Sequence, residues 1–240
     1  MGNKPLGFKA YGSIAHLPDS RMGPADHHCH EGQAAICTSK ARDRHDRIIC
    51  LEKIDGACVS VANINGDIVP LIRAGYRAID AKYEHLRRFH CWATSNANRF
   101  SFLRPGQRIV GEWVALAHGT VYTRLPSDPF IIFDIFEGKS RLPYDLVTLA
   151  SETSGLSAAP VISDGAPITV PDALDRLGAE GNFGAVDGPE GVVYRVERKG
   201  CVDFLAKFVK PTKIDGQFLP EISGLPEIWN WQPAPSKEGE

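Results

Sequence analysis

Residues 47–73 read RIICLEKIDGACVSVANINGDIVPLIR, and this stretch decides the fold class. Two short apolar runs, at residues 48–51 and 57–62, stand on either side of Glu52-Lys53-Ile54-Asp55-Gly56. Asn65-Gly66 is a strong signal for a type I′ β-hairpin, and residues 68–72 supply its return strand. The pattern predicts that Lys53 lies between two strands of an antiparallel meander.

Periodicity predicts the remaining elements. An apolar stripe at helical spacing indicates a helix at residues 79–93, and shorter helices are expected at residues 144–151 and 171–177. Strands are expected at residues 108–116, 130–136, 192–197 and 201–209, with the last two joined by a turn at Lys199-Gly200. Residues 130–136 are nearly all apolar, so we expect that strand to be buried on both faces. The predicted fold class is α+β, with antiparallel sheets flanked by helices.

Composition divides the chain into three parts. Residues 1–45 are rich in Gly, Pro, His and charge, and are predicted to be a loop-rich extension with one or two short strands, packed on the main domain. Residues 46–211 carry most of the predicted elements and form that domain. Residues 212–240 are rich in Pro, Gly and acidic residues and are predicted to be a tail, with Trp229 and Trp231 packing back on the body.

The bulk composition is that of an ordinary globular protein. Of 240 residues, 43% are hydrophobic and 23% charged, and the formal net charge of −2 neither indicates nor excludes a local groove for nucleic acid. No apolar run approaches the roughly 20 residues that span a bilayer, and no secretory signal is visible at the N-terminus. We therefore expect a cytoplasmic protein without membrane association.

The cysteines and histidines do not predict a metal centre. The six cysteines include no Cys-x-x-Cys pair and are interpreted as free thiols. Residues 26–31, with His27-His28-Cys29-His30 at their centre, offer ligand-type side chains, but consecutive residues rarely converge on one ion and no second cluster at zinc spacing follows. We interpret this stretch as a polar loop near a substrate surface.

The chemistry of the chain starts at Lys53. A lysine held in a tight turn can act as a nucleophile once its amine is deprotonated, and Gly56 permits the close approach of a phosphate or ribose. The four-residue pattern Lys-x-Asp-Gly is weak by itself, because it occurs again at residues 213–216. The first copy has an apolar strand on each side, whereas the second follows Pro211 and opens the tail. We interpret the second copy as a surface turn.

Further charged and aromatic residues follow Lys53 in a fixed order. Taken singly, an arginine and a glutamate can be a surface pair, and two lysines can be the solvated side of a strand. Taken together, they provide cations for phosphates, carboxylates for a metal and a ribose, and an aromatic face for a base. The set comprises Arg73, Glu112, Phe133, Glu190, Lys207 and Lys210.

With these residues in this order, the sequence resembles the covalent nucleotidyltransferase superfamily of polynucleotide ligases and mRNA capping enzymes, and most of all its ATP-dependent RNA ligase branch. The resemblance covers residues 46–211 and implies the nucleotidyltransferase (ligase adenylation) fold. It implies that Lys53 is the nucleophile that becomes lysyl-AMP, and that Asp55 and Gly56 shape its turn. It also implies that Glu52 lies near the adenine and that Arg73 binds the phosphates of ATP or the 5′-phosphate of the acceptor.

The resemblance assigns the remaining residues as well. Glu112 is expected to contact the ribose, Phe133 to stack on the base, and Glu190 to bind a divalent metal, Mg²⁺ or Mn²⁺. Lys207 and Lys210 match the lysines that contact the α-phosphate and promote catalysis. Such lysines usually stand two residues apart on one face of a strand, whereas these stand three apart. One of them is therefore expected to point away, and we favour Lys207 as the one in the site.

The implied function is the joining of RNA ends, a 5′-phosphate and a 3′-hydroxyl, at the expense of ATP. Related ligases continue into a further C-terminal domain, whereas 30 residues follow Lys210, so we expect a partner to supply such a domain if sealing requires one. The alternatives are a GTP-using capping guanylyltransferase, a DNA ligase, and a nucleic-acid-binding module without catalysis. Lys53, Glu112 and Glu190 are all present, which favours an enzyme over the binding module.

Overall fold

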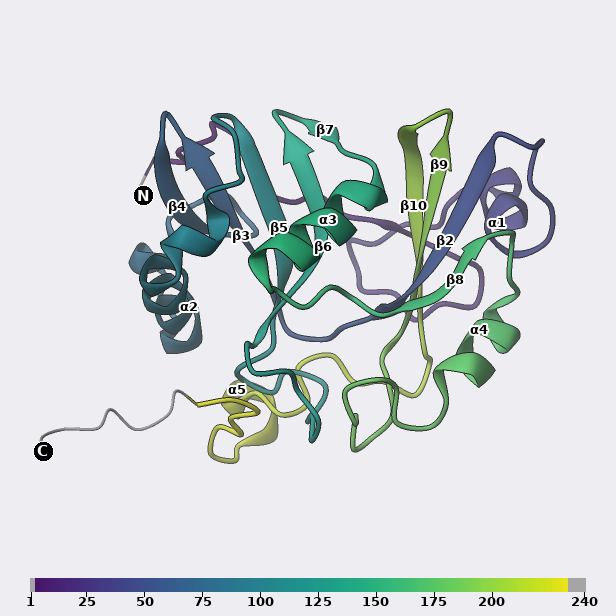
Figure 1. The fold of residues 1–240 in the computed structure, drawn as a ribbon. Helices are drawn as coiled ribbons and strands as arrows, with labels where there is room; N and C mark the ends of the chain where they lie inside the picture. Colours follow the sequence, from purple (N-terminus) through teal and green to yellow (C-terminus); the bar gives the residue numbers. More distant parts are fainter. Residues whose placement is uncertain (1–2, 233–240) are drawn as a thin grey trace, which may run out of the picture.

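A computed structural model describes residues 3–232 of the chain. Within these residues, two five-stranded sheets stand side by side (Figure 1). The first sheet has the order β1 (Ala15–His16), β10 (Cys201–Val209), β9 (Gly191–Arg198), β2 (Asp46–Lys53) and β8 (Val161–Gly165). The second has the order β4 (Asp67–Ile72), β3 (Ala57–Ile64), β5 (Gln107–Trp113), β6 (Phe130–Glu137) and β7 (Ser140–Arg141). All neighbours are antiparallel except β1 and β10, which are parallel.

Helices cover the sheets. The helix α2 (Glu84–Ser95) packs on β4, and α3 (Tyr144–Ser154) packs on β6 and crosses the front of the view in Figure 1. The helices α1 (Glu31–Thr38) and α4 (Val170–Leu177) pack against the first sheet. The four-residue helix α5 (Pro220–Ser223) lies near the C-terminal end of the described chain. The α+β fold predicted from the sequence is confirmed.

The strand β2 is buried on both faces, which explains its unbroken apolar run. Side chains alternate between the faces of a strand. Ile49 and Leu51 therefore join the core shared with the second sheet, α2 and α3. Ile48 and Cys50 point the other way, into the core beneath α1 and α4. This double burial makes β2 a rigid support for Lys53, its last residue.

The predicted meander around Lys53 is wrong. The strands β2 and β3 belong to different sheets, because β2 is hydrogen-bonded by β9 and β8 on its two edges while β3 pairs with β4 and β5. Residues 54–56 carry the chain from one sheet to the other. At Gly56 this crossing runs so close to β5 that an added Cβ would lie 2.7 Å from the Trp113 carbonyl oxygen. Local sequence patterns do not distinguish a crossing between sheets from a hairpin within one.

Both predicted hairpins are confirmed. Asn65 and Gly66 have φ values of 55° and 102° and connect β3 to β4. Lys199 and Gly200, with φ values of 51° and 77°, connect β9 to β10. Positive φ at both central residues is the requirement of a type I′ turn, whose twist matches that of the paired strands.

Several element boundaries differ from the prediction. The helix expected at residues 79–93 begins at Glu84, because residues 78–80 form a separate 3₁₀ turn. The first 45 residues contain a helix, α1, that was not predicted, and the short edge strand β8 was also missed. Both elements are short, and both are stabilised by contacts with the first sheet. The strand β6 is buried on both faces as predicted.

The segment after β10 returns to the body of the molecule. Trp229 and Trp231 pack against the main core as predicted, and the ring of Trp231 lies 5.9 Å from that of Trp113. Residues 233–240 of the predicted tail lie outside the described residues. Among the helices that the structure describes, none has the length and apolar character needed to cross a membrane.

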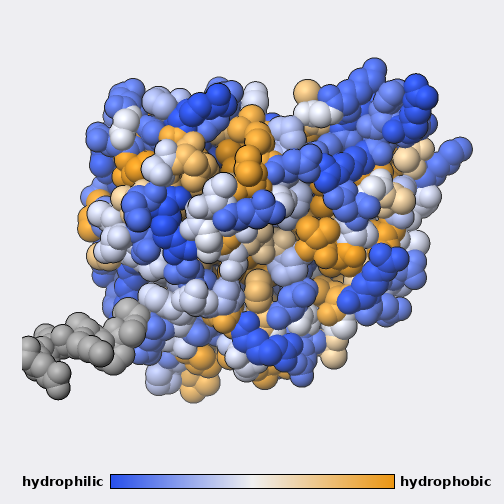
Figure 2. Space-filling view, viewed as in Figure 1, coloured by the Kyte–Doolittle hydropathy of each residue, from blue (hydrophilic) through white to orange (hydrophobic). Residues whose placement is uncertain are grey.

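The surface shown in Figure 2 carries both hydrophilic and hydrophobic residues. On the face shown in Figure 2, hydrophobic residues form small separate patches between hydrophilic ones rather than one continuous band. Leu146 and Leu149 of α3 and Val161 of β8 are among the exposed apolar side chains. Single exposed apolar residues of this kind are normal for a folded chain.

Candidate active site

Lys53 is the last residue of β2 and lies beside a charged residue that immediately precedes the neighbouring strand, β9. Its Nζ lies 2.5 Å from Oε2 of Glu190, and the two side chains are only 19% and 15% exposed. Glu190 immediately precedes β9, whose first residue, Gly191, is the register partner of Lys53. The pairing of β2 with β9 thus brings together two residues 137 positions apart.

Two more carboxylates influence the same amine. Burial works against the charged form of Lys53, but the negative charges of Glu190, Glu112 and Asp55 outweigh it and raise the pKa of the amine above its usual value. Burial in turn raises the pKa of Glu112 to about 8 and that of Glu190 to about 7. The site therefore consists of a protonated lysine among carboxyl groups that give up their protons near neutral pH.

Asp55 is fixed by a loop that follows β5. The Thr120 hydroxyl donates a hydrogen bond of 2.8 Å to Oδ2 of Asp55, and the Asp55 amide donates one of 2.9 Å to the Tyr122 hydroxyl. An added Cβ at Gly119 would lie 2.6 Å from the same Oδ2 atom. The Thr120 hydroxyl and the missing side chain of Gly119 seat this carboxylate, and the Tyr122 hydroxyl holds the backbone of the turn.

A cavity of about 760 Å³, open to solvent, adjoins Lys53. Of the predicted site residues, it is lined by Glu52, Lys53, Arg73, Glu112, Phe133 and Lys207.

Glu52 lines the cavity, and one of its carboxylate oxygens has hydrogen-bond partners while the other has none in the described chain. Its Oε2 accepts hydrogen bonds from the backbone and side-chain nitrogens of Asn182, whereas its Oε1 is buried without a hydrogen-bond partner in the described chain. This oxygen packs against Gly181. Phe133 supplies the aromatic wall, and the ring of Tyr11 meets it edge-on at 5.3 Å.

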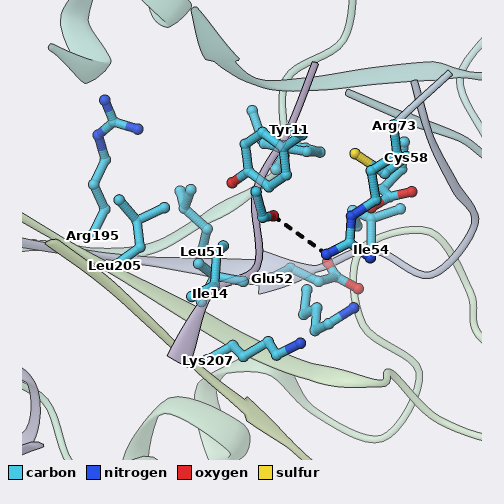
Figure 3. A pocket seen from close by; sticks show the side chains of 16 residues that line it. Tyr11, Ile14, Leu51, Glu52, Ile54, Cys58, Arg73, Arg195, Leu205 and Lys207 are labelled. Atoms are coloured by element: carbon cyan, nitrogen blue, oxygen red, sulfur yellow. Dashed lines mark hydrogen bonds between the residues drawn. The ribbon is translucent and has the colours of Figure 1, made fainter. Parts of the chain in front are cut away.

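The N-terminal segment forms part of this cavity, a contribution that the sequence did not predict in detail. Tyr11, Gly12 and Ile14 line it. In Figure 3, Tyr11 lies between Arg195 on one side and Arg73 on the other, and the dashed line joins Arg73 to the Gly12 carbonyl oxygen, 3.3 Å away.

The same segment reaches Lys207. His16 of β1 is the register partner of Lys207, and the Lys207 Nζ lies 3.9 Å from Oδ1 of Asp26. The other oxygen of Asp26 lies 3.1 Å from Nε2 of His16, and Nδ1 of His16 lies 2.7 Å from the Ser20 hydroxyl. Burial and the charge of Lys53 lower the pKa of Lys207. A connected polar network from the N-terminal segment therefore borders this lysine.

Lys210 does not line the cavity. An added Cβ at Gly188 would lie 3.7 Å from its Nζ, and burial together with the charge of Lys213 lowers its pKa. Of the two lysines, Lys207 lines the cavity and Lys210 does not, and the catalytic roles expected for them stay predictions.

The interpretation of residues 213–216 as a surface turn is wrong in part. Ile214 is 55% exposed, but Lys213 is only 6% exposed and its Nζ lies 3.3 Å from the Thr120 hydroxyl oxygen. The second Lys-x-Asp-Gly copy thus packs beside the loop that holds Asp55 of the first. The physical reason is the return of the chain after Pro211, which composition does not reveal.

Comparisons with known proteins decide the family. The sequence model of RNA ligases matches residues 46–209. The chain belongs to the RNA ligase family. No curated protein matches the chain.

Solved structures of RNA ligases share the fold. A Naegleria gruberi RNA ligase mutant with AMP and Mn aligns with a TM-score of 0.52 and 14% identity over 73% of this chain and 53% of its own. Another mutant of that ligase, with ATP and Mn, aligns with a TM-score of 0.50 and 14% identity over 69% and 50%. An archaeal ATP-dependent RNA ligase aligns with a TM-score of 0.46 and 21% identity over 68% of this chain and 42% of its own. The chain spans about half the length of the Naegleria ligase.

The carboxyl groups of this RNA ligase family member fit a divalent cation of the Mg²⁺ type. Oε2 of Glu112 is buried without a hydrogen-bond partner in the described residues. Glu112 and Glu190 both act on the charge of the Lys53 amine. Within residues 3–232, no three ligand-type side chains form a ready-made cage. Mg²⁺ typically binds through one or two carboxylates, substrate phosphates and waters, so a cage is not required.

Several residues of the candidate site were not predicted from the sequence. Local pattern gives no signal for Tyr11, Thr120 and Asn182, since each reaches the site from a loop or short segment. Asp26 belongs to the polar stretch 26–31, but nothing in the sequence pairs it with Lys207. For Lys213 the signal was visible, because it repeats the motif of Lys53, but the surrounding composition pointed to a surface turn.

Proposed function

We propose that this chain is an ATP-dependent RNA ligase that forms lysyl-AMP at Lys53. One observation carries the proposal: the amine of Lys53 contacts Glu190 at the edge of a cavity that Phe133, Arg73 and Lys207 also line. This arrangement offers a nucleophile, an aromatic surface for a base and cations for phosphates. Membership of the RNA ligase family supports the choice of RNA.

In the first step, Nζ of Lys53 attacks the α-phosphorus of ATP. A phosphorus–nitrogen bond forms, the bond to the bridging oxygen breaks, and pyrophosphate leaves. The amine first releases its proton to solvent, because only the neutral form has a free electron pair. Lys207 offsets the negative charge that gathers on the α-phosphate, and Phe133 and Glu52 orient the adenine.

Glu190, with Glu112 nearby, would hold Mg²⁺ or Mn²⁺, which supplies positive charge to the triphosphate. Engagement of Glu190 in this role would remove the contact that keeps Lys53 protonated. The carboxyl group thereby connects metal binding to the activation of the nucleophile.

In the two later steps, AMP passes from Lys53 to the 5′-phosphate of an RNA end, and a 3′-hydroxyl then displaces AMP to seal the backbone. Arg73, which is exposed at the rim of the cavity, is suited to bind the 5′-phosphate. We include in the proposal a partner that supplies a further domain if sealing by the isolated chain proves slow.

The first test is covalent labelling. The purified chain is incubated with ATP or GTP labelled at the α-phosphate, with Mg²⁺ or Mn²⁺, and separated on a denaturing gel. We expect label from ATP on the wild type, none on Lys53→Ala, and wild-type labelling on Lys40→Ala, which alters an exposed lysine.

The other outcomes discriminate between the alternatives. Label from GTP alone would assign the chain to the capping branch. Labelling of Lys53→Ala would exclude Lys53 as the nucleophile, and absence of label from either nucleotide would favour a binding module. A labelled chain is then offered 5′-phosphorylated RNA and DNA, and preferential transfer of AMP to DNA would identify a DNA ligase.

A further inference from the structure

Lys213 is a buried lysine to which the proposed reaction assigns no role. It is 6% exposed, and its hydrogen-bond partner is the neutral Thr120 hydroxyl at 3.3 Å. Lysine is almost never buried unless its charge is paired, because removing an ammonium group from water is costly. In the described part of the chain, its ammonium forms no direct ion pair, although it has three donor hydrogens. Such a placement calls for an explanation.

The Thr120 hydroxyl connects Lys213 to the turn of Lys53. Thr120 is fully buried, and its single hydroxyl proton is donated to Oδ2 of Asp55 at 2.8 Å. The same oxygen therefore accepts the bond from Lys213. A positive donor on one side and a carboxylate on the other polarise the hydroxyl in the same direction, so the two bonds strengthen each other.

Close packing fixes this arrangement. An added Cβ at Gly119 would lie 2.6 Å from Oδ2 of Asp55 and 2.9 Å from the carbonyl oxygen of Ile214. The backbone next to Lys213 and the carboxylate of Asp55 therefore lie on either side of a residue that has no side chain. Neither group can shift far without a clash.

The charge of Lys213 also acts on the carboxyl groups around the nucleophile. Burial raises the pKa of Asp55, and the positive charge of Lys213 acts against that rise. Burial likewise lowers the pKa of Lys213, and the negative charges of Asp55, Asp187 and Glu190 act against that fall. Because the site gathers several carboxyl groups, a buried cation behind them reduces the repulsion that an incoming triphosphate would meet.

We propose that Lys213 is a positioning residue of the active site, which acts through Thr120 to hold the Asp55 carboxylate ionised and directed within the turn of Lys53. The second Lys-x-Asp-Gly copy is then part of the machinery of the first. This inference rests on the proposed formation of lysyl-AMP.

The first experiment separates this role from a structural one. Met matches the length of Lys without its charge, so Lys213→Met fills the same space. Replacing an unpaired buried charge by an apolar group leaves stability unchanged or raises it. We therefore expect an unchanged or higher melting temperature, together with a single-turnover rate of lysyl-AMP formation about 10- to 100-fold lower at saturating ATP. Lys213→Arg should recover part of the rate, and Lys40→Met should match the wild type.

A double-mutant cycle tests the route through Thr120. Thr120→Val removes the hydroxyl, and the variant carrying both Thr120→Val and Lys213→Met should be no slower than the slower single variant. If the wild type forms no lysyl-AMP, the proposed function itself fails. If the wild type forms it and Lys213→Met keeps the wild-type rate, loses rate only as it loses stability, or adds its effect in full to that of Thr120→Val, the positioning role is excluded.

Discussion

At the scale of the residue, the carboxyl groups around Lys53, the nucleophile that we propose, favour the protonated form of its amine. Glu190, Glu112 and Asp55 together raise the pKa of Lys53 against the effect of its burial. A protonated amine cannot attack phosphorus. The carboxyl groups that keep Lys53 protonated include the group that we propose for metal binding. Lys53 is therefore expected to become a nucleophile only once the cation and ATP are in place.

This arrangement predicts a rise of activity with pH. The neutral fraction of an amine increases about tenfold per pH unit below its pKa, and a raised pKa moves this rise to higher pH. We expect the single-turnover rate of lysyl-AMP formation, at saturating ATP and metal, to increase between about pH 6 and pH 9. Melting temperatures recorded over the same range control for unfolding. A rate that is flat or falls with pH would contradict this account of Lys53.

At the scale of the element, the two-residue strand β1 connects the N-terminal segment to the strand that carries Lys207. It pairs with β10 at Lys207, and the backbone nitrogen of Leu17 donates to the Lys207 carbonyl oxygen at 2.8 Å. Asp26 follows on the next loop and faces the amine of the same lysine. The N-terminal segment, which lies outside residues 46–209 of the family match, therefore borders the site through both main chain and side chain.

Substitution of Asp26 tests this contribution. Asp26→Asn keeps the size of the side chain but removes its charge from beside Lys207. The pair is partly exposed and its atoms are 3.9 Å apart, so its worth is at most about 1 kcal/mol. We expect the rate of lysyl-AMP formation to fall by about fivefold or less, with little change in melting temperature. Asp19→Asn makes the same change at an exposed position of the same segment, and an equal loss there would refute a specific role for Asp26.

At the scale of the whole molecule, the segment after β10 supports the site from behind. Backbone hydrogen bonds join Phe218 to His118 and Trp231 to Ala115, on the loop that carries Thr120. The indole nitrogen of Trp231 also donates to the Ser127 carbonyl oxygen at 2.9 Å. The C-terminal segment thus holds the loop that in turn holds Asp55.

Removal of one anchor should measure this support. Trp231→Ala deletes the contact with Trp113 and the hydrogen bond to Ser127, and we expect the free energy of unfolding in urea to fall by about 2 kcal/mol, since the indole is half-buried. Leu225→Ala alters a side chain that is 63% exposed and should change it by no more than about 0.5 kcal/mol. Equal, small effects of both substitutions would show that residues 212–232 contribute little to stability.

The parts of the fold that the sequence predicted well depend on local rules. Asn65-Gly66 and Lys199-Gly200 turn their hairpins because their backbones tolerate positive φ. The apolar run of β2 indicates a buried strand wherever that strand lies. The order of charged residues from Lys53 to Lys207 led to the RNA ligase family, which the family match confirms.

The sequence by itself determined the long strands, the two hairpin turns and the family, because hydrophobic period, glycine and motif order act over a few residues or survive as linear order. Only the tertiary structure decided that β2 and β3 belong to different sheets, that Tyr11 lines the cavity, that Asp26 faces Lys207, and that Lys213 is buried beside Thr120. Each of these depends on pairing between segments far apart in the chain. Such pairing is set by the total burial and hydrogen bonding of the folded molecule, and no local pattern records it.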